Sequence, residues 1–244
     1  MNDPFELSPN IEPSQFNQRR LEALLRQDHY IEEAYRKEGQ RHRLTRKEFK
    51  RLYLKDVPRR ADEALPRIPK NLERIRRNFP DKFSKYWRLI CASVVRDSVL
   101  MWSHYAENHT GLVLEFDTKQ PPFSKIPSDC WLTVKYSDKK ADYVYSHKNR
   151  EFRERMFAMA ASKASIWSYE NEIRIVLPDT SLRDGRFLRL TTKSVAAVYC
   201  GCRMSAADKK LVQAALSSPH FKHIKLWLAS LNESDYALKF KEPI

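Results

Sequence analysis

The stretch Trp167-Ser168-Tyr169-Glu170-Asn171-Glu172-Ile173-Arg174 leads into the apolar run Ile173 to Leu177 and decides how the second half of the chain folds. Alternate side chains of a strand point to the same face, so an extended backbone here places Glu170 and Glu172 side by side. Two neighbouring carboxylates can hold different protonation states and divide acid, base and ion-stabilising roles. The stretch therefore predicts a strand that carries a pair of functional acids.

A purely structural role explains the same pattern. Arg174 follows on the same predicted face, and a Glu, Glu, Arg ladder is an ordinary way to complete the solvated side of a half-buried strand. Exposed charge pairs of this kind stabilise a sheet modestly and need no substrate. Pattern alone favours this structural interpretation, and only the neighbouring residues weigh against it.

Length and composition predict a soluble, folded and basic protein. The 244 residues, 42% of them hydrophobic, suffice for a sizeable core, and we expect a single domain over residues 1–244. The formal net charge is +14, and residues 11–90 hold 22 Lys and Arg against 12 Asp and Glu. An excess of this size, concentrated in one third of the chain, favours an anionic partner such as nucleic acid, a nucleotide or an acidic protein, and charge alone does not say which.

Residues 14–88 form the basic part of the chain, and apolar residues at helical spacing predict a helical section. Two helices joined near Gly39 fit this pattern best, and Pro58, Pro66, Pro69 and Pro80 are expected to break the rest into short pieces. Several basic groups could follow a phosphate backbone, although on helices they are more often a solvated face interleaved with Glu. These groups are Arg41-His42-Arg43, Arg46-Lys47, Lys50-Arg51 and Arg74, Arg76, Arg77.

Residues 89–244 form the sheet-containing section. Few helices interrupt the predicted strands, which argues for an α+β fold with a mostly antiparallel or mixed sheet rather than a doubly wound one. Lys148 to Ala161 and Ser205 to Leu216 are the expected helices, the second capped by Ser205. The predicted strands are Leu89–Val95, Gly111–Phe116, Cys130–Tyr136, Ile173–Leu177, Phe187–Leu190, Val195–Cys200, Ile224–Leu228 and Tyr236–Phe240.

An aromatic segment precedes the strand at Gly111. Trp102, His104 and Tyr105 lie within four residues of one another, and such density suits the recognition of a flat ring. The alternative is equally open, because a histidine between aromatic residues is often a hydrogen-bonded core residue. Trp102 and Tyr105 could likewise be the buried stripe of a helix.

Lys163 and the N-terminal Asn2-Asp3 are further candidates. Lys163 lies seven residues before Glu170, at the expected end of the helix that feeds the strand, where it could hold a phosphate or pair with Glu170. A lysine that extends its stem over apolar surface at a helix end is the ordinary alternative. Asn2-Asp3-Pro4-Phe5 is a turn-forming sequence whose polar groups could reach a site, or simply a turn.

Several classes of protein are disfavoured. The chain has only four glycines and contains none of the common phosphate-loop, dinucleotide-binding, nucleophile-elbow or zinc-protease motifs. The seven histidines and four cysteines show no spacing typical of a metal site, so we expect no metal and reduced thiols. No apolar run is long enough to span a bilayer and no signal peptide is recognisable, which favours a cytoplasmic protein without membrane contact.

Together these motifs resemble the bacterial domain-of-unknown-function family 2971, over the first six residues and about 90–216. The family name implies no activity. The residues that carry the resemblance are Asn2-Asp3-Pro4-Phe5-Glu6, Met101 to Ala106 with Asn108-His109 and Gly111 to Asp117, Lys163, Trp167 to Arg174, and Tyr199 to Ser205.

The Glu170-Asn171-Glu172 motif also resembles the Glu-x-Glu strand of ADP-ribosyltransferases. This resemblance implies NAD as the cofactor, with Glu172 stabilising the oxocarbenium-like transition state at the nicotinamide ribose and Glu170 orienting or deprotonating the acceptor. Tyr105 or Trp167 would stack on the nicotinamide ring. The family pattern has a His or Arg on a strand that would precede Asn2, so either the start is truncated or the site is incomplete, with His104 as the candidate substitute.

The leading expectation is therefore an ADP-ribosyltransferase-like protein that uses NAD to modify a nucleic acid or protein, as a toxin or phage-defence effector. Its catalytic residues would be Glu170, Glu172 and His104. Asn2, Asp3, Trp102, Tyr105, Lys163, Trp167 and Arg174 would bind the cofactor. The alternative is a non-catalytic nucleic-acid-binding module that uses residues 14–88, and an antitoxin-like or assembly protein with structural acids is a third possibility.

Overall fold

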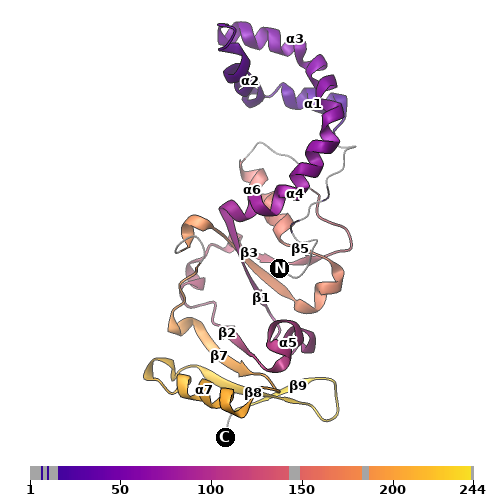
Figure 1. Ribbon diagram of the computed structural model, residues 1–244. Coiled ribbons are helices and arrows are strands. Elements are labelled where there is room, and N and C mark those ends of the chain that lie inside the picture. Colours follow the sequence, from indigo (N-terminus) through magenta and orange to yellow (C-terminus); the bar gives the residue numbers. More distant parts are fainter. Residues whose placement is uncertain (1–6, 8–9, 11–15, 143–148, 183–186, 243–244) are drawn as a thin grey trace. The chain divides into compact units, whose positions relative to one another are not determined.

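The computed structural model describes residues 7, 10, 16–142, 149–182 and 187–242. They form two compact units (Figure 1). Of the described residues, the helical unit contains Asn10, residues 16–80, Ala141 and Asp142, and the sheet unit contains Leu7, Asp81–Lys140 and the residues after 148. The α+β class is confirmed, with helices first and sheets after them. The expectation of a single domain stays a prediction.

The helical unit is built around one long apolar stripe. Phe49, Tyr53 and Val57 recur at helical spacing on α3 and pack against Ile31 of α2. The capping box of Thr45 and Glu48 fixes the start of α3. The helices are α1 (Gln18–Leu25), α2 (Asp28–Ala34), the π-helical η2 (Tyr35–Gly39), α3 (Arg46–Ala64), η3 (Leu65–Arg67) and α4 (Ile68–Tyr86).

The expected junction near Gly39 is present, because η2 ends at this residue and a turn leads to α3. A Cβ at Gly39 would lie 2.3 Å from a ring carbon of Tyr35, so the packing requires glycine. The expected breaks at Pro58 and Pro80 are wrong, since these residues lie inside α3 and α4, whereas Pro66 lies in the 3-10 turn η3 that separates the two helices. A proline within a helix costs ~3 kcal/mol. Val57 and Ala61, both fully buried on either side of Pro58, offset that cost.

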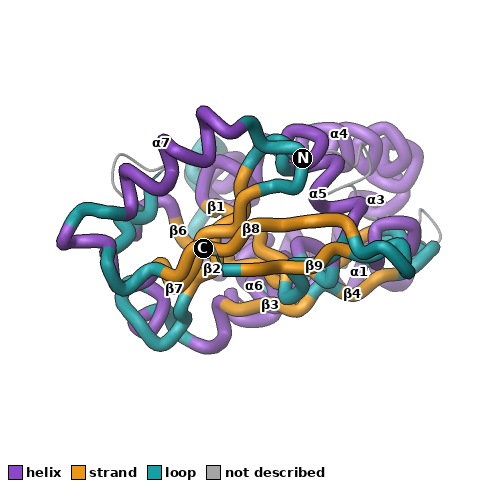
Figure 2. The backbone as a smooth tube through the Cα atoms, turned by 90° about the horizontal axis from the view of Figure 1, so that it is seen from below, coloured by secondary structure: helices purple, strands orange, loops and turns teal. Residues whose placement is uncertain are grey.

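The sheet unit contains two main sheets, with β8 and β9 side by side in Figure 2. All pairings are antiparallel except β7 with β8, which α7 connects, and β4 with β5. The first sheet has the order β1 (Trp87–Ser93), β6 (Glu172–Pro178), β3 (Trp131–Thr133). The second has the order β2 (Leu112–Phe116), β7 (Val195–Cys200), β8 (Lys225–Leu231), β9 (Leu238–Lys241), and a short pair joins β4 (Lys135–Tyr136) to β5 (Ser162–Lys163).

Three helices accompany these sheets: α5 (Val99–Tyr105), α6 (Asn149–Ala160) and α7 (Ala206–Leu216). Ser205 caps α7 through Asp208, as the sequence predicts. The predicted strand at Phe187–Leu190 is wrong, because these residues are outside every strand of two or more residues and both Phe187 and Leu190 are exposed. Short 3-10 turns complete the unit: η4 (Glu107–His109), η5 (Phe123–Lys125), η6 (Ser128–Cys130), η7 (Ser165–Glu170), η8 (Asp179–Ser181), η9 (Thr192–Ser194) and η10 (Pro219–Phe221).

Each main sheet has its own apolar core. Ile175 and Leu177 of β6 pack with Phe123 and Leu182, and Trp102 of α5 packs with Tyr199 of the second sheet. Within the described part of the chain, no helix combines the length and the apolar character that crossing a membrane requires.

Candidate functional site

Strand β6 presents two chemically different faces. Ile175 and Leu177 point into an apolar core, whereas Glu172 and Arg174 alternate with them on the opposite face, as the sequence predicts. That face is buried rather than solvated, since only 6% of Glu172 and 0% of Arg174 are exposed. The interpretation of this face as the solvated side of a strand is therefore wrong.

Glu170 reaches the same place by a different route. It ends the 3-10 helix η7, and strand β6 starts only at Glu172. Asn171 between them has a φ of 43°, a left-handed conformation that asparagine tolerates better than most residues. The prediction that both acids lie on one strand is thus wrong. The turn at Asn171 nevertheless leaves the Glu170 side chain 2% exposed and within reach of the same lysine as Glu172.

Lys163 joins the two carboxylates. Its Nζ donates to Oε2 of Glu170 and lies 3.2 Å from Oε2 of Glu172. The prediction that Lys163 ends a helix is wrong, because α6 ends at Ala160 and Lys163 belongs to β5. The parallel pairing of β5 with β4 aligns Lys163 with Tyr136.

Arg174 holds the other side of Glu172. Its Nε donates to Oε1 at 2.8 Å and its Nη2 to Oε2 at 2.9 Å, the two-pronged geometry of a strong arginine–carboxylate pair. Its Nη1 donates to the Ala160 carbonyl at 2.6 Å. Lys163, Glu170, Glu172 and Arg174, called the charge cluster below, thus contain two cations and two anions. Balanced pairing of this kind is what makes buried charge tolerable.

The charge cluster fixes two protonation states. Burial raises the pKa of Glu172, but hydrogen bonds from Arg174 and Cys91 and the charges of Arg174 and Lys163 outweigh it, so this pKa is lowered. Glu172 is therefore ionised at neutral pH. Burial and the hydrogen bond to Glu170 raise the pKa of Tyr105 to about 12, which keeps its phenol protonated as a donor.

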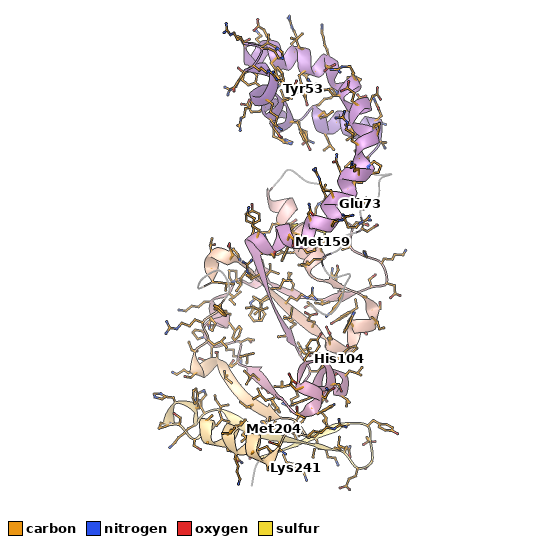
Figure 3. All side chains as sticks on the ribbon, viewed as in Figure 1. Tyr53, Glu73, His104, Met159, Met204 and Lys241 are labelled. Atoms are coloured by element: carbon orange, nitrogen blue, oxygen red, sulfur yellow. The ribbon has the colours of Figure 1, made fainter. Side chains whose placement is uncertain are left out.

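An aromatic cluster lies beside the charge cluster and consists of His104, Tyr105, Trp167 and Tyr169. The Tyr105 hydroxyl donates to Oε1 of Glu170 at 2.8 Å, while half of the Tyr105 residue remains exposed. His104, labelled in Figure 3, shares a hydrogen bond of 3.0 Å with the Tyr169 hydroxyl. The Trp167 ring centroid lies 5.1 Å from Nζ of Lys163. Exposed aromatic surface thus adjoins buried charge, and the Tyr105–Glu170 hydrogen bond connects the two.

Trp102 lies apart from this cluster. Its residue is 1% exposed, packs against Ala106 and Tyr199, and donates its indole N–H to the Arg96 carbonyl at 2.7 Å. Trp102 therefore occupies the core position that the helical spacing allowed as an alternative. The candidates Asn2 and Asp3 lie outside the described residues.

The structure adds three supporting residues that sequence reasoning missed. The Tyr136 hydroxyl accepts the Glu172 backbone N–H at 2.8 Å, and the Ser93 hydroxyl donates to the Glu170 carbonyl at 2.6 Å. Cys91 contributes a side-chain hydrogen bond to Glu172. All three residues come from strands other than β6, since Cys91 and Ser93 belong to β1 and Tyr136 to β4. The pairing of β1 with β6 and of β4 with β5 places them at the site, and no local sequence motif identifies them.

The described residues include no group of three or more His, Cys, Asp or Glu side chains placed to hold a metal ion.

Comparison with protein families singles out the same region. Residues 101–175 match the model described as "Protein of unknown function (DUF2971)". The match runs from α5 to β6 and so includes the charge cluster, His104, Tyr105 and Trp167. Comparison with curated proteins and with solved structures gave no match. The resemblance to DUF2971 is therefore confirmed over residues 101–175, which are the segments that build the candidate site.

The ion pairs of Glu172 predict a pH-dependent penalty for Glu172→Gln. Loss of one partner from a buried pair costs ~3–5 kcal/mol of unfolding free energy. The pKa of Glu172 is lower in the folded than in the unfolded state, so the unfolded state takes up a proton first as the pH falls. The ion pairs therefore give their full stabilisation above pH 4.5, the ordinary pKa of glutamate. This stabilisation is lost as the pH falls through the lower pKa of the folded state. The penalty should therefore shrink in acid. Urea unfolding followed by tryptophan fluorescence measures it, since all five tryptophans lie within residues 87–227.

Asp129→Asn supplies the matched control. Asp129 pairs with Arg153 at 2.8 Å in the same unit, but both side chains are about half exposed. Its loss should cost less than about 1 kcal/mol. Equal penalties for the two variants, or a Glu172→Gln penalty that does not change with pH, would contradict the assigned pairing.

Proposed function

We propose that the charge cluster and the aromatic cluster form an ADP-ribosyltransferase-like site that uses NAD to modify a nucleic acid or a protein, as a toxin or phage-defence effector. The observation that carries this proposal is the hydrogen bond between the half-exposed Tyr105 and the buried Glu170. Through it, a flat aromatic surface open to a ligand connects directly to a pair of acids held by fixed charges. Glu170 and Glu172 keep the Glu-x-Glu spacing of the resemblance, although only Glu172 lies on the strand.

The two acids suit different parts of such a reaction. Cleavage of the bond between nicotinamide and ribose gives the ribose carbon positive charge, and an ionised carboxylate stabilises that charge. Glu172, with its lowered pKa, is assigned this role. Glu170, at the edge that Tyr105 contacts, is assigned to the acceptor group that replaces nicotinamide. Nicotinamide leaves with the bonding electrons, and the acceptor supplies the new pair.

For this site to work, the Lys163 ammonium group must leave the two carboxylates that it binds. Its ammonium group occupies both carboxylates, and a cationic transition state would compete with it. A lysine has a flexible stem, and the diphosphate of NAD offers it an anionic partner. We therefore assign Lys163 to that diphosphate in the bound state, while the two hydrogen bonds of Arg174 keep Glu172 in place.

The aromatic cluster supplies the surface for the nicotinamide ring. Trp167 lies over Lys163 and Tyr105 contacts Glu170, so a ring stacked on either residue lies next to the acids. His104, held by the Tyr169 hydroxyl, is available to hydrogen-bond the cofactor. Tyr105, His104 and Trp167 come from α5 and η7, two elements of the matched family region.

Labelled NAD tests the transferase proposal. Incubation of the protein with candidate nucleic-acid and protein acceptors should show transfer of label or loss of NAD. Glu172→Gln should reduce the rate at least roughly a hundredfold, the range for removal of one group that stabilises a transition-state charge. Asp129→Asn, which removes the same charge at an exposed pair, should retain the rate.

Tyr105→Phe keeps the test valid if Glu172→Gln fails to fold. Half of Tyr105 is exposed, so the variant should fold, keep the stacking surface and lose only the bond to Glu170. We expect it to bind NAD and to transfer label more slowly. Absence of NAD binding at millimolar concentration, or full activity of Glu172→Gln, would overturn the proposal.

The helical unit favours a second candidate function, contact with nucleic acid. Some of its basic residues are neutralised, since Arg46 pairs with Glu32, Lys50 with Asp28 and Arg77 with Glu73. Other exposed basic residues have no ion pair within the described part of the chain. These are Arg19, Arg20, Arg41, Arg43, Lys47, Arg51, Lys55, Arg67, Lys70 and Arg74. Unpaired arginine and lysine on helices can neutralise phosphates, which supports this candidate.

Salt dependence tests the nucleic-acid candidate. If the helical unit contacts phosphates, affinity for a duplex should fall steeply with salt, with a logarithmic slope of about 0.9 for each phosphate neutralised. Replacement of Arg74, Arg76 and Arg77 by glutamine should weaken binding and reduce that slope, whereas Glu172→Gln should leave both unchanged. Binding that does not respond to salt, or that the triple variant retains in full, would contradict this function.

A further inference from the structure

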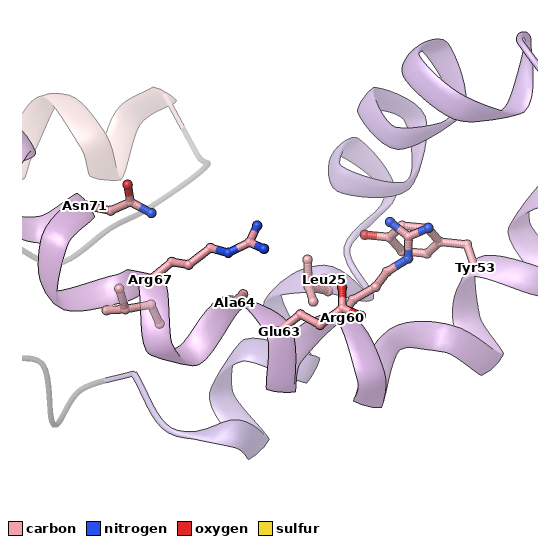
Figure 4. Close-up of a pocket in the computed structure, with 8 residues that line it drawn as sticks. Leu25, Tyr53, Arg60, Glu63, Ala64, Arg67 and Asn71 are labelled. Carbon is pink, nitrogen blue, oxygen red and sulfur yellow. The ribbon is translucent and has the colours of Figure 1, made fainter.

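A pocket of about 380 Å³ lies within the helical unit, away from the charge cluster and the aromatic cluster in sequence (Figure 4). Its volume falls within the range of small-molecule sites, roughly 300–1,000 Å³. Its lining comes from α1, α3, η3 and α4. The lining residues are Leu25, Tyr53, Arg60, Glu63, Ala64, Arg67, Ile68 and Asn71.

Most of the lining belongs to one face of a continuous helical stretch. Arg60, Glu63, Arg67 and Asn71 follow one another at spacings of three or four residues, which places them on the same side of a helix. Ala64 and Ile68 lie between them and add apolar surface. The face therefore alternates polar and apolar groups along the length of the pocket.

The cations of this pocket are not equivalent. Arg60 donates to Glu38 at 3.0 Å and to Asp56 at 2.9 Å, and its guanidinium lies 4.7 Å from the Tyr53 ring centroid, so it is fixed and neutralised. Arg67, by contrast, forms no ion pair with any described residue. The pocket thus offers one guanidinium whose charge is not compensated by a neighbouring carboxylate.

The remaining lining residues indicate which other chemical groups the ligand carries. Glu63 already pairs with Arg59, so its carboxylate is charge-compensated and can accept hydrogen bonds from hydroxyl groups. The Asn71 amide can donate or accept. Leu25 and Ile68 provide apolar surface for a flat body. Inorganic phosphate would satisfy Arg67 but leave these other groups unused.

We infer that this pocket binds a nucleoside monophosphate. The phosphate binds the Arg67 guanidinium through two parallel hydrogen bonds, the geometry that arginine favours with phosphate. The ribose hydroxyls donate to the Glu63 carboxylate, the Asn71 amide hydrogen-bonds the polar edge of the base, and the base rests on Leu25 and Ile68. The inference does not rest on the transferase proposal, and it shares only Arg67 with the nucleic-acid candidate.

Calorimetric titration of the full chain with AMP, and separately with inorganic phosphate, tests this inference. AMP should bind, and phosphate should bind at least about tenfold more weakly, because it lacks the groups that contact Glu63, Asn71 and the apolar residues. Arg67→Ala should weaken AMP binding at least about tenfold, the effect of losing one hydrogen-bonded charge. Arg74→Ala is the matched control, since Arg74 is an exposed arginine of α4 outside the pocket.

Ala64→Leu gives a second measurement that leaves every charge in place. The larger side chain occupies part of the pocket and should weaken AMP binding without changing the affinity for phosphate. Three results would overturn the inference: no AMP binding at millimolar concentration, equal affinities for phosphate and AMP, or equal losses in Arg67→Ala and Arg74→Ala. The last result would mean that AMP responds to general positive charge rather than to this pocket.

Discussion

The paired hydrogen bonds between Arg174 and Glu172 are the constraint on which the sheet unit depends. Both residues lie on β6, the central strand of its sheet, and on a face that is closed to water. An ionised group in such a place must find its counter-charge nearby, because desolvation otherwise costs several kcal/mol per ion. Lys163 and Glu170 complete the balance, which links β5 and η7 to the strand.

The same constraint extends the cluster to its surroundings. The Ala160 carbonyl at the end of α6 accepts from Arg174, and the Tyr136 hydroxyl of β4 accepts from the Glu172 backbone. The hydrogen bond from Tyr105 to Glu170 connects this network to α5. Trp102 of the same helix packs in the core of the second sheet. A ligand that contacts Tyr105 would consequently act on a network that reaches both sheets.

Sequence patterns predicted what depends on local periodicity. The shared face of Glu172 and Arg174, the cap at Ser205 and the helix turn at Gly39 follow from strand alternation, capping chemistry and glycine sterics. Failures came where tertiary packing overrides local preference. Burial of Val57 and Ala61 carries α3 through Pro58, and the left-handed Asn171 places Glu170 on a 3-10 helix instead of the strand. Burial of the charge cluster itself depends on β4 and β5, whose pairing has no local signature.

If the proposed function holds, NAD contacts the partly exposed aromatic cluster rather than the aromatic core, and this can be measured residue by residue. Trp167 lies over Lys163 at the site, whereas Trp102 is buried and donates to the Arg96 carbonyl. The indole N–H signals of both tryptophans can be followed by NMR, with Trp→Phe variants used for assignment, while NAD is added. The Trp167 signal should shift with saturation, and the Trp102 signal should stay in place. A Trp167 signal that does not move at millimolar NAD would contradict the proposed function.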